Sequence, residues 1–320
     1  MNPMYYSMRN ISFSDIVLNY LSYLKRLNKF SKIRSFLRYR RIYRNYISVT
    51  MNILRKKYPI EAKLREGYIL LMRNELEARL YGGVTDGFEY DLSNDIVTLG
   101  GSYVDSTKKV VLHGGITKGD IWSIYVENVY DQIPVNQKTV IDIGANIADS
   151  CIYFALRGAD KVIGLEPMPK NYELAIKNVE SNNLSDKITI LLAGCGAFNG
   201  EITVAPSYEA GIGIAQKDLK YGVKVPLQTI DQILNNYSLV LDNSIILKMD
   251  CDGCEYETIL STDDRTIQKF SHIMMEYHFG YRNLKEKIEK SGFKVSVTRP
   301  HIHTWNSLKL QSGFLFAEKY

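Results

Sequence analysis

The sequence predicts an α/β fold whose core is a mostly parallel, seven-stranded sheet with helices on both faces. Apolar runs of strand length alternate with amphipathic stretches of helix length through the second half of the chain. VIDIGANIADS, residues 140–150, leads from an apolar run through a glycine turn into a helix, and VIGLEP, residues 162–167, ends the next apolar run in a carboxylate. The 320-residue chain is 45% hydrophobic, enough for this core and an additional segment.

Strands and helices are expected to alternate through the main domain, residues 134–320. The strands are expected from Thr139 into VIDIG and at Val162–Pro167, Ile188–Leu192, Ile245–Met249, Ile273–Tyr277, Phe293–Val297 and Phe314–Ala317. Helices are expected at Asn171–Asn182, Tyr256–Ser261 and Leu284–Ser291. Ligands bind such sheets beyond the carboxyl ends of the strands, so the residues that follow each strand are the candidates for function.

A smaller β-rich segment, residues 67–133, is expected to precede the main domain. It contains three short strand-like runs separated by glycine pairs (Gly82-Gly83, Gly100-Gly101, Gly114-Gly115), at Gly67–Met72, Asp95–Leu99 and Lys109–His113. A helix is expected from Ile121 to Gln132, leading into the first strand of the main sheet.

Residues 1–66 are expected to form a basic helical extension. They contain 15 Lys and Arg against three acidic residues, so they carry +12 of a chain whose net charge is only +5. Apolar residues recur at helical spacing (Phe13, Ile16, Tyr20, Leu24, Leu27), and a looser series runs from Ile33 to Leu54. Tyrosines alternate with arginines between Arg38 and Tyr46. This segment could pack on the main domain with a solvated basic face, bind nucleic acid, or rest on an anionic membrane.

The turn after the first strand favours a nucleoside cofactor without phosphates. Gly144 permits a sharp turn, Asn146 opens a helix, and Glu166 can accept hydrogen bonds from ribose hydroxyls. A pyrophosphate site would need the glycines of G-x-G-x-x-G, of which two are absent here, and Asp149 would repel a phosphate. S-adenosylmethionine (SAM) is the commonest cofactor of this kind, and Asp142 offers negative charge near its cationic groups. The alternative is an α/β protein with no cofactor at this edge.

No apolar run is long enough to span a membrane, and the N-terminus lacks a cleavage pattern, so we expect a cytoplasmic protein that could associate peripherally with a membrane. Four cysteines fit a reducing compartment. Cys251 and Cys254 form a C-x-x-C pair directly after a strand; we expect buried thiols there rather than a zinc site or a disulfide.

Several motifs in register resemble the FkbM family of SAM-dependent methyltransferases, over about half of the chain. They are VIDIGANIADSCIYFALRGADKVIGLEP, NYELAIKNVESNN, PLQTIDQIL, LKMDCDGCEYETIL and IMMEYH. The resemblance implies a Rossmann-like class I methyltransferase fold and O-methylation of hydroxyls on sugars, glycans or other small-molecule or lipid-linked acceptors. The long lead-in resembles archaeal members of the family.

The family motifs also suggest which residues form the site. The cofactor contacts implied are Asp142, Gly144, Ala145, Asn146, Glu166, Pro167, Gly194, Cys195 and Asp250. Ala148 replaces the last glycine of the family's D-x-G-A-N-x-G. In the family's K-x-D-x-E-G-x-E, which starts here at Lys248, Asp252 replaces a glutamate; we expect Asp252 and Glu255 to contact the acceptor.

Catalysis is expected at the ends of the fourth and fifth core strands. Asp250 would orient the acceptor beside Glu276, and His278 would act as the base because the usual pKa of histidine lies near neutrality. The same carboxylates could instead bind magnesium, although we assign no metal. Two rival functions remain: a nucleic-acid methyltransferase that docks through its basic N-terminus, and a non-catalytic SAM-binding scaffold.

Overall fold

A computed structural model describes residues 36–37, 39–65, 67, 69–73, 78, 88–91, 93–100, 109–205, 222–238, 244–305 and 308–320. The helix expected around Phe13 to Leu27 lies outside these residues, as do Ile33, Arg38, Gly82-Gly83 and Gly101. The described residues divide into two compact units. Unit 1 contains residues 90–97 and 110–320, and unit 2 contains those of residues 36–89 and 98–109. The expected division into segments 1–66, 67–133 and 134–320 stays a prediction.

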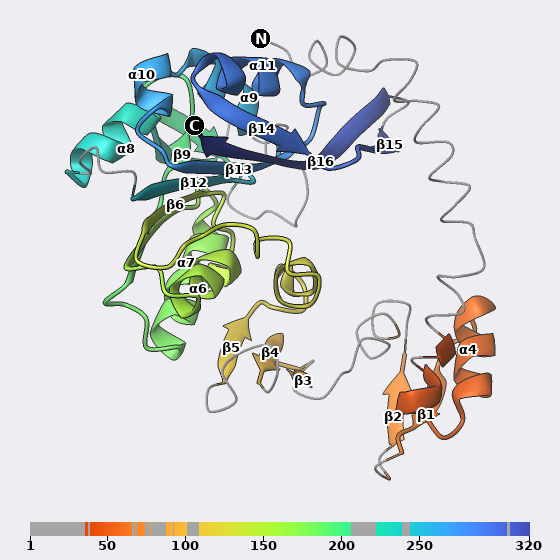
Figure 1. The fold of residues 1–320 in the computed structure, drawn as a ribbon. Coiled ribbons are helices and arrows are strands. Elements are labelled where there is room, and N and C mark those ends of the chain that lie inside the picture. Colours follow the sequence, from red (N-terminus) through yellow and green to blue (C-terminus); the bar gives the residue numbers. More distant parts are fainter. Residues whose placement is uncertain are drawn as a thin grey trace. The chain divides into compact units, whose positions relative to one another are not determined.

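Unit 1 is built on the expected sheet, with strand order β14-β16-β13-β12-β6-β7-β8 (Figure 1). The strands are β6 (Thr139–Ile143), β7 (Lys161–Leu165), β8 (Ile188–Leu191), β12 (Ile245–Met249), β13 (His272–Tyr277), β14 (Phe293–Val297) and β16 (Leu308–Lys319). The pairs from β8 through β13 are parallel, whereas β16 is antiparallel to β13 and β14. β15 (His301–Trp305) pairs only with β16. The mostly parallel α/β fold expected from the sequence is therefore confirmed.

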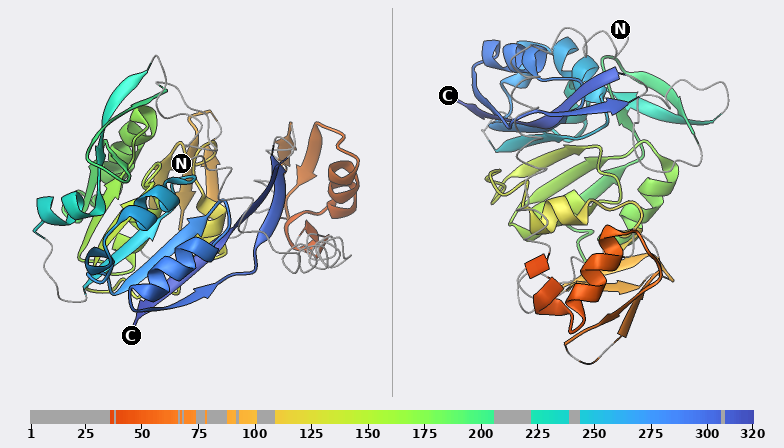
Figure 2. Two further views of the ribbon diagram at one scale, coloured as in Figure 1. Left: turned by 90° about the horizontal axis from the view of Figure 1, so that it is seen from above. Right: turned by 90° about the vertical axis from the view of Figure 1, so that its right-hand side faces the viewer.

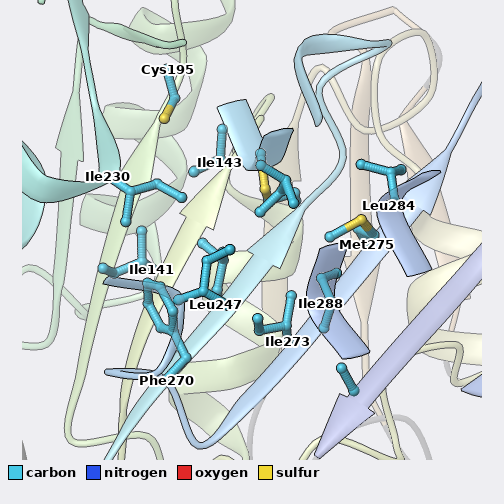
Figure 3. Close-up of a cluster of buried hydrophobic side chains, with 14 of the residues drawn as sticks. Ile141, Ile143, Cys195, Ile230, Leu247, Phe270, Ile273, Met275, Leu284 and Ile288 are labelled. Atoms are coloured by element: carbon cyan, nitrogen blue, oxygen red, sulfur yellow. The ribbon is translucent and has the colours of Figure 1, made fainter. Parts of the chain in front are cut away.

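Helices cover both faces of this sheet, as the views in Figure 2 show. α6 (Asp149–Leu156) and α7 (Pro169–Ser181) lie on one side. The other side carries α8 (Ile230–Asn236), α9 (Cys254–Ser261), α10 (Asp264–Ile267) and α11 (Arg282–Lys290). Figure 3 shows the core between β6, β12 and β13 and the second group of helices, where Leu247, Ile273 and Met275 meet Ile230 and Ile288. All five residues of the central strand β12 are buried, which is typical of a parallel strand covered on both faces.

A smaller sheet in unit 1 has the order β10-β11-β9 and lies beyond the main one. Its strands are β9 (Gly194–Cys195), β10 (Gly200–Val204) and β11 (Val223–Gln228). Apolar side chains from β10 and β11 pack with Met168 at the start of α7. We did not expect these strands from the sequence, although they help to build the candidate site.

The lead-in strands β4 (Ile96–Leu99) and β5 (Val110–His113) form near the expected positions, together with β3 (Phe88–Asp91), in the order β3-β4-β5. Two asparagines of α7 bind the outer edge of β5. Asn182 accepts from Val111 N and donates to Val111 O, at 2.9 and 2.7 Å, and Asn178 does the same for His113, at 2.7 and 3.0 Å.

The prediction of a helix from Ile121 to Gln132 is wrong for most of that range. Only η2 (Trp122–Val126) is helical, in the wide π form, and turns follow it. Asn128 adopts a left-handed conformation with φ 51°, which a continuing helix cannot contain.

Unit 2 contains α4 (Tyr46–Leu54) and a hairpin of β1 (Ile60–Lys63) and β2 (Ile69–Met72). The second strand was expected and the first was not. Among the described residues, no helix is both long enough and apolar enough to cross a membrane.

Candidate active site

A cavity of about 380 Å³ opens in unit 1 where β6, β7, β12 and β13 end. This volume lies within the range of small-molecule sites. The sequence-predicted residues that line it are Gly144, Asn146, Glu166, Pro167, Gly194, Cys195, Asp250, Asp252, Glu276 and His278. Residues that the sequence did not suggest complete the wall, among them Asp120, Met168, Ile202, Val204 and Leu227.

The turn after β6 is shaped by backbone conformations that few residues tolerate. Gly144 has φ 82°, and a Cβ placed on it would lie 1.8 Å from the carbonyl oxygen of Asp250. Asn146 and Ala148 are also left-handed, with φ 48° and 65°. Asn146 Nδ2 donates to the carbonyl of Lys118 at 2.6 Å, which holds the turn in place. The backbone at Gly144 therefore lies closer to the end of β12 than a residue with a side chain would allow.

Glu166 is held rigidly at the end of β7. One carboxylate oxygen accepts from the backbone N–H of Asn146 and the other from that of Met168, both at 2.9 Å. Burial raises the pKa of Glu166 to about 7, although these two hydrogen bonds act in the opposite direction. Each oxygen keeps a further lone pair, so the side chain can still accept hydrogen bonds from two hydroxyl groups of a ligand.

Another part of the cavity wall is apolar. Gly194 and Cys195 of β9 lie beside Ile202 and Leu227 of the small sheet. A Cβ on Gly194 would lie only 3.0 Å from Cδ1 of Ile202, so the missing side chain keeps this wall flat. A flat apolar surface near Glu166, which can accept hydrogen bonds from ribose hydroxyls, suits a nucleobase.

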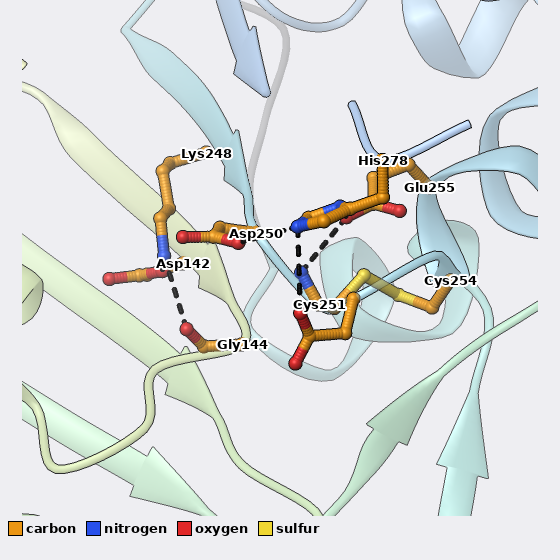
Figure 4. The surroundings of a disulfide bond; sticks show 9 residues. Asp142, Gly144, Lys248, Asp250, Cys251, Cys254, Glu255 and His278 are labelled. Atoms are coloured by element: carbon orange, nitrogen blue, oxygen red, sulfur yellow. Dashed lines mark hydrogen bonds and ion pairs between the residues drawn. A yellow bond between two sulfur atoms is a disulfide. The ribbon is translucent and has the colours of Figure 1, made fainter. Parts of the chain in front are cut away.

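Asp142 and Ala145, both expected to contact the cofactor, do not line the cavity. They are fully buried beneath it. Asp142 forms an ion pair of 2.7 Å with Lys248 and accepts from the hydroxyl of Ser150 at 2.6 Å. Lys248 Nζ also donates to the carbonyl of Gly144 at 3.1 Å, so the pair anchors the turn (Figure 4). Placing Asp142 at the cofactor from its position near a strand end was therefore wrong, because its side chain turns into the core.

Asp149, which the sequence suggested would repel a phosphate, has structural partners as well. Its carboxylate accepts from the backbone N–H groups of Asp120, at 2.7 Å, and Ser150, at 3.0 Å. It is buried, and burial raises its pKa to about 7. Asp149 therefore positions Asp120, which does line the cavity.

His278 lies among carboxylates at the end of β13. Its Nδ1 is 3.3 Å from Oε1 of Glu255, and its Nε2 is 3.5 Å from Asp252 and 3.8 Å from Asp250 (Figure 4). Glu255 is completely buried, does not line the cavity, and accepts from the backbone N–H of Cys251 at 3.0 Å. Glu255, expected to contact the acceptor, instead holds the histidine.

This environment changes the chemistry of the histidine. Burial alone would lower the pKa of His278, but Glu255, Asp250 and Glu276 outweigh it and raise that pKa to about 10. The side chain is therefore a cation at neutral pH. The argument that made His278 the base assumed an unperturbed pKa, and that assumption is wrong.

The two carboxyl groups beside His278 differ in acidity. Burial raises the pKa of Asp250 to about 6, against the influence of Lys248 and His278. Burial and the charge of Asp250 raise the pKa of Glu276 to about 8. Near pH 7, Asp250 is therefore mostly a carboxylate and Glu276 mostly a carboxylic acid, the separation expected of an acid and a base at one site.

The same three side chains have a spacing that a cation could use, since one ligand atom from each of Asp250, Glu276 and His278 lies within 4.8 Å of the others. A histidine binds a metal only as the neutral ring. A cation bound here would therefore have to displace the proton of the His278 imidazolium.

The C-x-x-C pair is a disulfide, which corrects the expectation of buried thiols. Cys251 is bonded to Cys254, and both line the cavity (Figure 4). The two residues between them are left-handed, Asp252 with φ 53° and Gly253 with φ 112°, which reverses the chain tightly enough for the sulfurs to meet. Cys151 and Cys195 are free and buried. Because two of the four cysteines form a disulfide, the cysteines support a reducing compartment less strongly than we expected.

Comparison with known proteins identifies a family. Residues 142–302, half of the chain, match the model described as the methyltransferase FkbM domain. No curated protein matches the sequence.

Solved structures with a similar arrangement include precorrin-6y C5,15-methyltransferase from Geobacter metallireducens (13% identity, TM-score 0.33, 60% of this chain and 87% of that one). The chain is also similar to EvdMO1, with 12% identity, a TM-score of 0.36 and coverage of 60% of this chain and 39% of that one. It is similar to the METTL16 methyltransferase domain as well, with 18% identity, a TM-score of 0.35 and coverage of 62% of this chain and 66% of that one. It spans less than half of the EvdMO1 chain that it matches.

The cavity fits the cofactor of this family. Glu166 offers two free lone pairs at the strand edge, and Gly194 leaves a flat apolar wall beside it. The chain belongs to the FkbM methyltransferase family, and its methyl donor is SAM.

Proposed function

We propose that the protein transfers the methyl group of SAM to a hydroxyl of a sugar, a glycan or another small-molecule or lipid-linked acceptor. The observation that carries the proposal is the position of Asp250. Its carboxylate lines the cavity at the end of β12, beside the turn at Gly144, and has the imidazolium of His278 next to it. A hydroxyl must lose its proton as it attacks, and a carboxylate at this place can accept it.

The cofactor would supply a methyl group already activated by a positive sulfur, so the protein has to align the acceptor and remove one proton. Asp250 accepts that proton while the new carbon–oxygen bond forms. Glu276, in its acid form, donates a hydrogen bond that orients the acceptor. His278 keeps its charge throughout and stabilises the carboxylate of Asp250, while Glu255 fixes the imidazole ring. Asp252, 40% exposed, stays our candidate for acceptor binding.

The binding of SAM itself rests on Glu166, for which we propose the ribose contact. Glu166→Ala should weaken SAM binding at least about tenfold, because two charge-assisted hydrogen bonds are lost. Calorimetry of the purified variant measures this change. An affinity within about twofold of the original would remove Glu166 from the cofactor site.

The proposed function can be tested with methyl-labelled SAM and fractionated cell extract. Label should enter a glycan, lipid or small-molecule fraction as a base-stable methyl ether, and Asp250→Asn should abolish transfer while SAM still binds. Label in RNA would support the nucleic-acid alternative, and no label with SAM bound would support the scaffold. Because the long lead-in resembles that of archaeal members of the family, we would use an archaeal cell extract first.

A further inference from the structure

Exposed apolar side chains are concentrated in unit 2. Among the described residues, nine large apolar side chains are exposed, and six of them lie between residues 37 and 71. They are Leu37, Ile47, Met51, Leu54, Ile69 and Leu71. A set of this kind on one small element marks a surface that contacts something other than water.

Three of these side chains form a stripe along α4. Ile47, Met51 and Leu54 are 58%, 41% and 55% exposed and are spaced by four and three residues, which places them on one face of the helix. Val49, the buried residue of α4, projects from the opposite face. The stripe therefore faces away from the packed side of the helix.

The helix is fixed in this orientation. The side chain of Asn45 accepts from the backbone N–H of Lys63 at 2.8 Å and donates to the carbonyl of Glu61 at 2.7 Å, which ties the start of α4 to β1. Tyr43, three residues before the first residue of α4, is fully buried. α4 lies against the β1–β2 hairpin (Figure 1). The stripe cannot turn inward without breaking these contacts.

Basic side chains accompany the stripe. The described part of unit 2 up to residue 73 has one acidic residue, Glu61, and nine exposed basic ones. These are Arg40, Arg41, Arg44, Arg55, Lys56, Lys57, Lys63, Arg65 and Arg73. Three of them, Arg55 to Lys57, directly follow the stripe. Aliphatic side chains beside a concentration of positive charge match the boundary of an anionic bilayer, where acyl chains and phosphates lie next to each other.

We propose that α4 docks unit 2 on an anionic phospholipid membrane, with Ile47, Met51 and Leu54 entering the acyl boundary while the neighbouring arginines and lysines meet lipid phosphates. A nucleic acid would use the same positive charge but would gain nothing from three aliphatic side chains. The proposal does not depend on the identity of the methyl acceptor.

The full-length protein can be tested by sedimentation with vesicles. It should bind vesicles that contain phosphatidylglycerol, with binding that weakens as salt is added, and bind pure phosphatidylcholine at least about tenfold more weakly. Ile47→Gln should weaken binding at least about fivefold because it removes an inserted aliphatic side chain. Phe198→Gln, at a side chain 61% exposed in unit 1, is the matched control and should change binding by less than about twofold.

The charge contribution has its own pair of variants. Lys57→Gln should weaken binding to phosphatidylglycerol vesicles about fivefold, and Lys294→Gln, an exposed lysine of β14, should leave it unchanged. The thermal unfolding transitions measured by differential scanning calorimetry should be unchanged in all four variants, which shows that both units remain folded. Equal binding to both kinds of vesicle, or no effect of Ile47→Gln, would overturn the proposal. Binding to an RNA oligonucleotide that Lys57→Gln weakens and Ile47→Gln does not would point to nucleic acid instead.

Discussion

Gly144 is the position at which the site tolerates substitution least. Its φ of 82° and the 1.8 Å that would separate a Cβ from Asp250 O are two independent penalties. Gly144→Ala should lower the free energy of unfolding by at least about 3 kcal/mol and abolish SAM binding, because either the turn or the end of β12 must move. Urea unfolding and calorimetry measure the two effects.

Gly292 provides the control for backbone strain alone. It is also left-handed, with φ 91°, but has no atom within 4 Å of the position of a Cβ. Gly292→Ala should cost only about 1–2 kcal/mol and leave SAM binding unchanged. If both variants lost the same stability, the clash with Asp250 would not explain the glycine at 144.

The carboxyl groups of the proposed site predict a bell-shaped pH dependence of kcat/KM. Asp250 must be ionised, so activity rises with pH through about 6; Glu276 must be protonated, so activity falls through about 8. Glu276→Gln keeps a hydrogen-bond donor that cannot ionise. This variant should retain activity and move the alkaline limb towards the pKa of His278, about 10. An alkaline limb that stays near 8 would show that Glu276 is not the titrating group.

Sequence reasoning located most of these residues but not their charges. Glu166 and Asp250 line the cavity, as expected, because a residue that follows a parallel strand must lie at the carboxyl edge of the sheet. Asp142 was misplaced because its partner Lys248 is distant in the sequence. The pKa of His278 depends on three carboxylates, of which Glu255 and Asp250 come from another segment. Such charge balances follow from tertiary packing.

At the scale of elements, α7 contributes polar contacts as well as an apolar face. Asn178 is completely buried and also donates to the carbonyl of Ile147, at 2.9 Å. Asn178→Ala should lower the free energy of unfolding by roughly 2–4 kcal/mol, because it leaves the partly buried backbone groups of His113 and the buried carbonyl of Ile147 without this partner. Urea unfolding measures this loss. Glu173→Ala, at an exposed position of the same helix, should change stability by less than about 0.5 kcal/mol.

The elements found from the sequence and those missed differ in burial. β12 reads as an unbroken apolar run because neighbouring strands and helices cover it completely. β11 has only two buried residues and contains Pro226, which argues against a strand except at an edge or a bulge. The wall that includes Leu227 could therefore not be expected from the sequence.

At the scale of the whole molecule, the SAM site lies entirely within unit 1. If the two units unfold separately, SAM should move only one thermal transition. At a hundredfold excess over its Kd it should stabilise unit 1 by about 2.7 kcal/mol, while the transition of unit 2 stays in place. Differential scanning calorimetry with and without SAM tests this. An equal shift of all transitions would mean that the units unfold together.

The contact between α7 and β5 also bears on solubility. In the sheet β3-β4-β5, the outer edge of β5 would present unpaired N–H and C=O groups to any other extended chain. Asn178 and Asn182 satisfy the groups of Val111 and His113 as a further strand would. The helix thus closes this edge to pairing between molecules and protects the protein against the growth of intermolecular sheets.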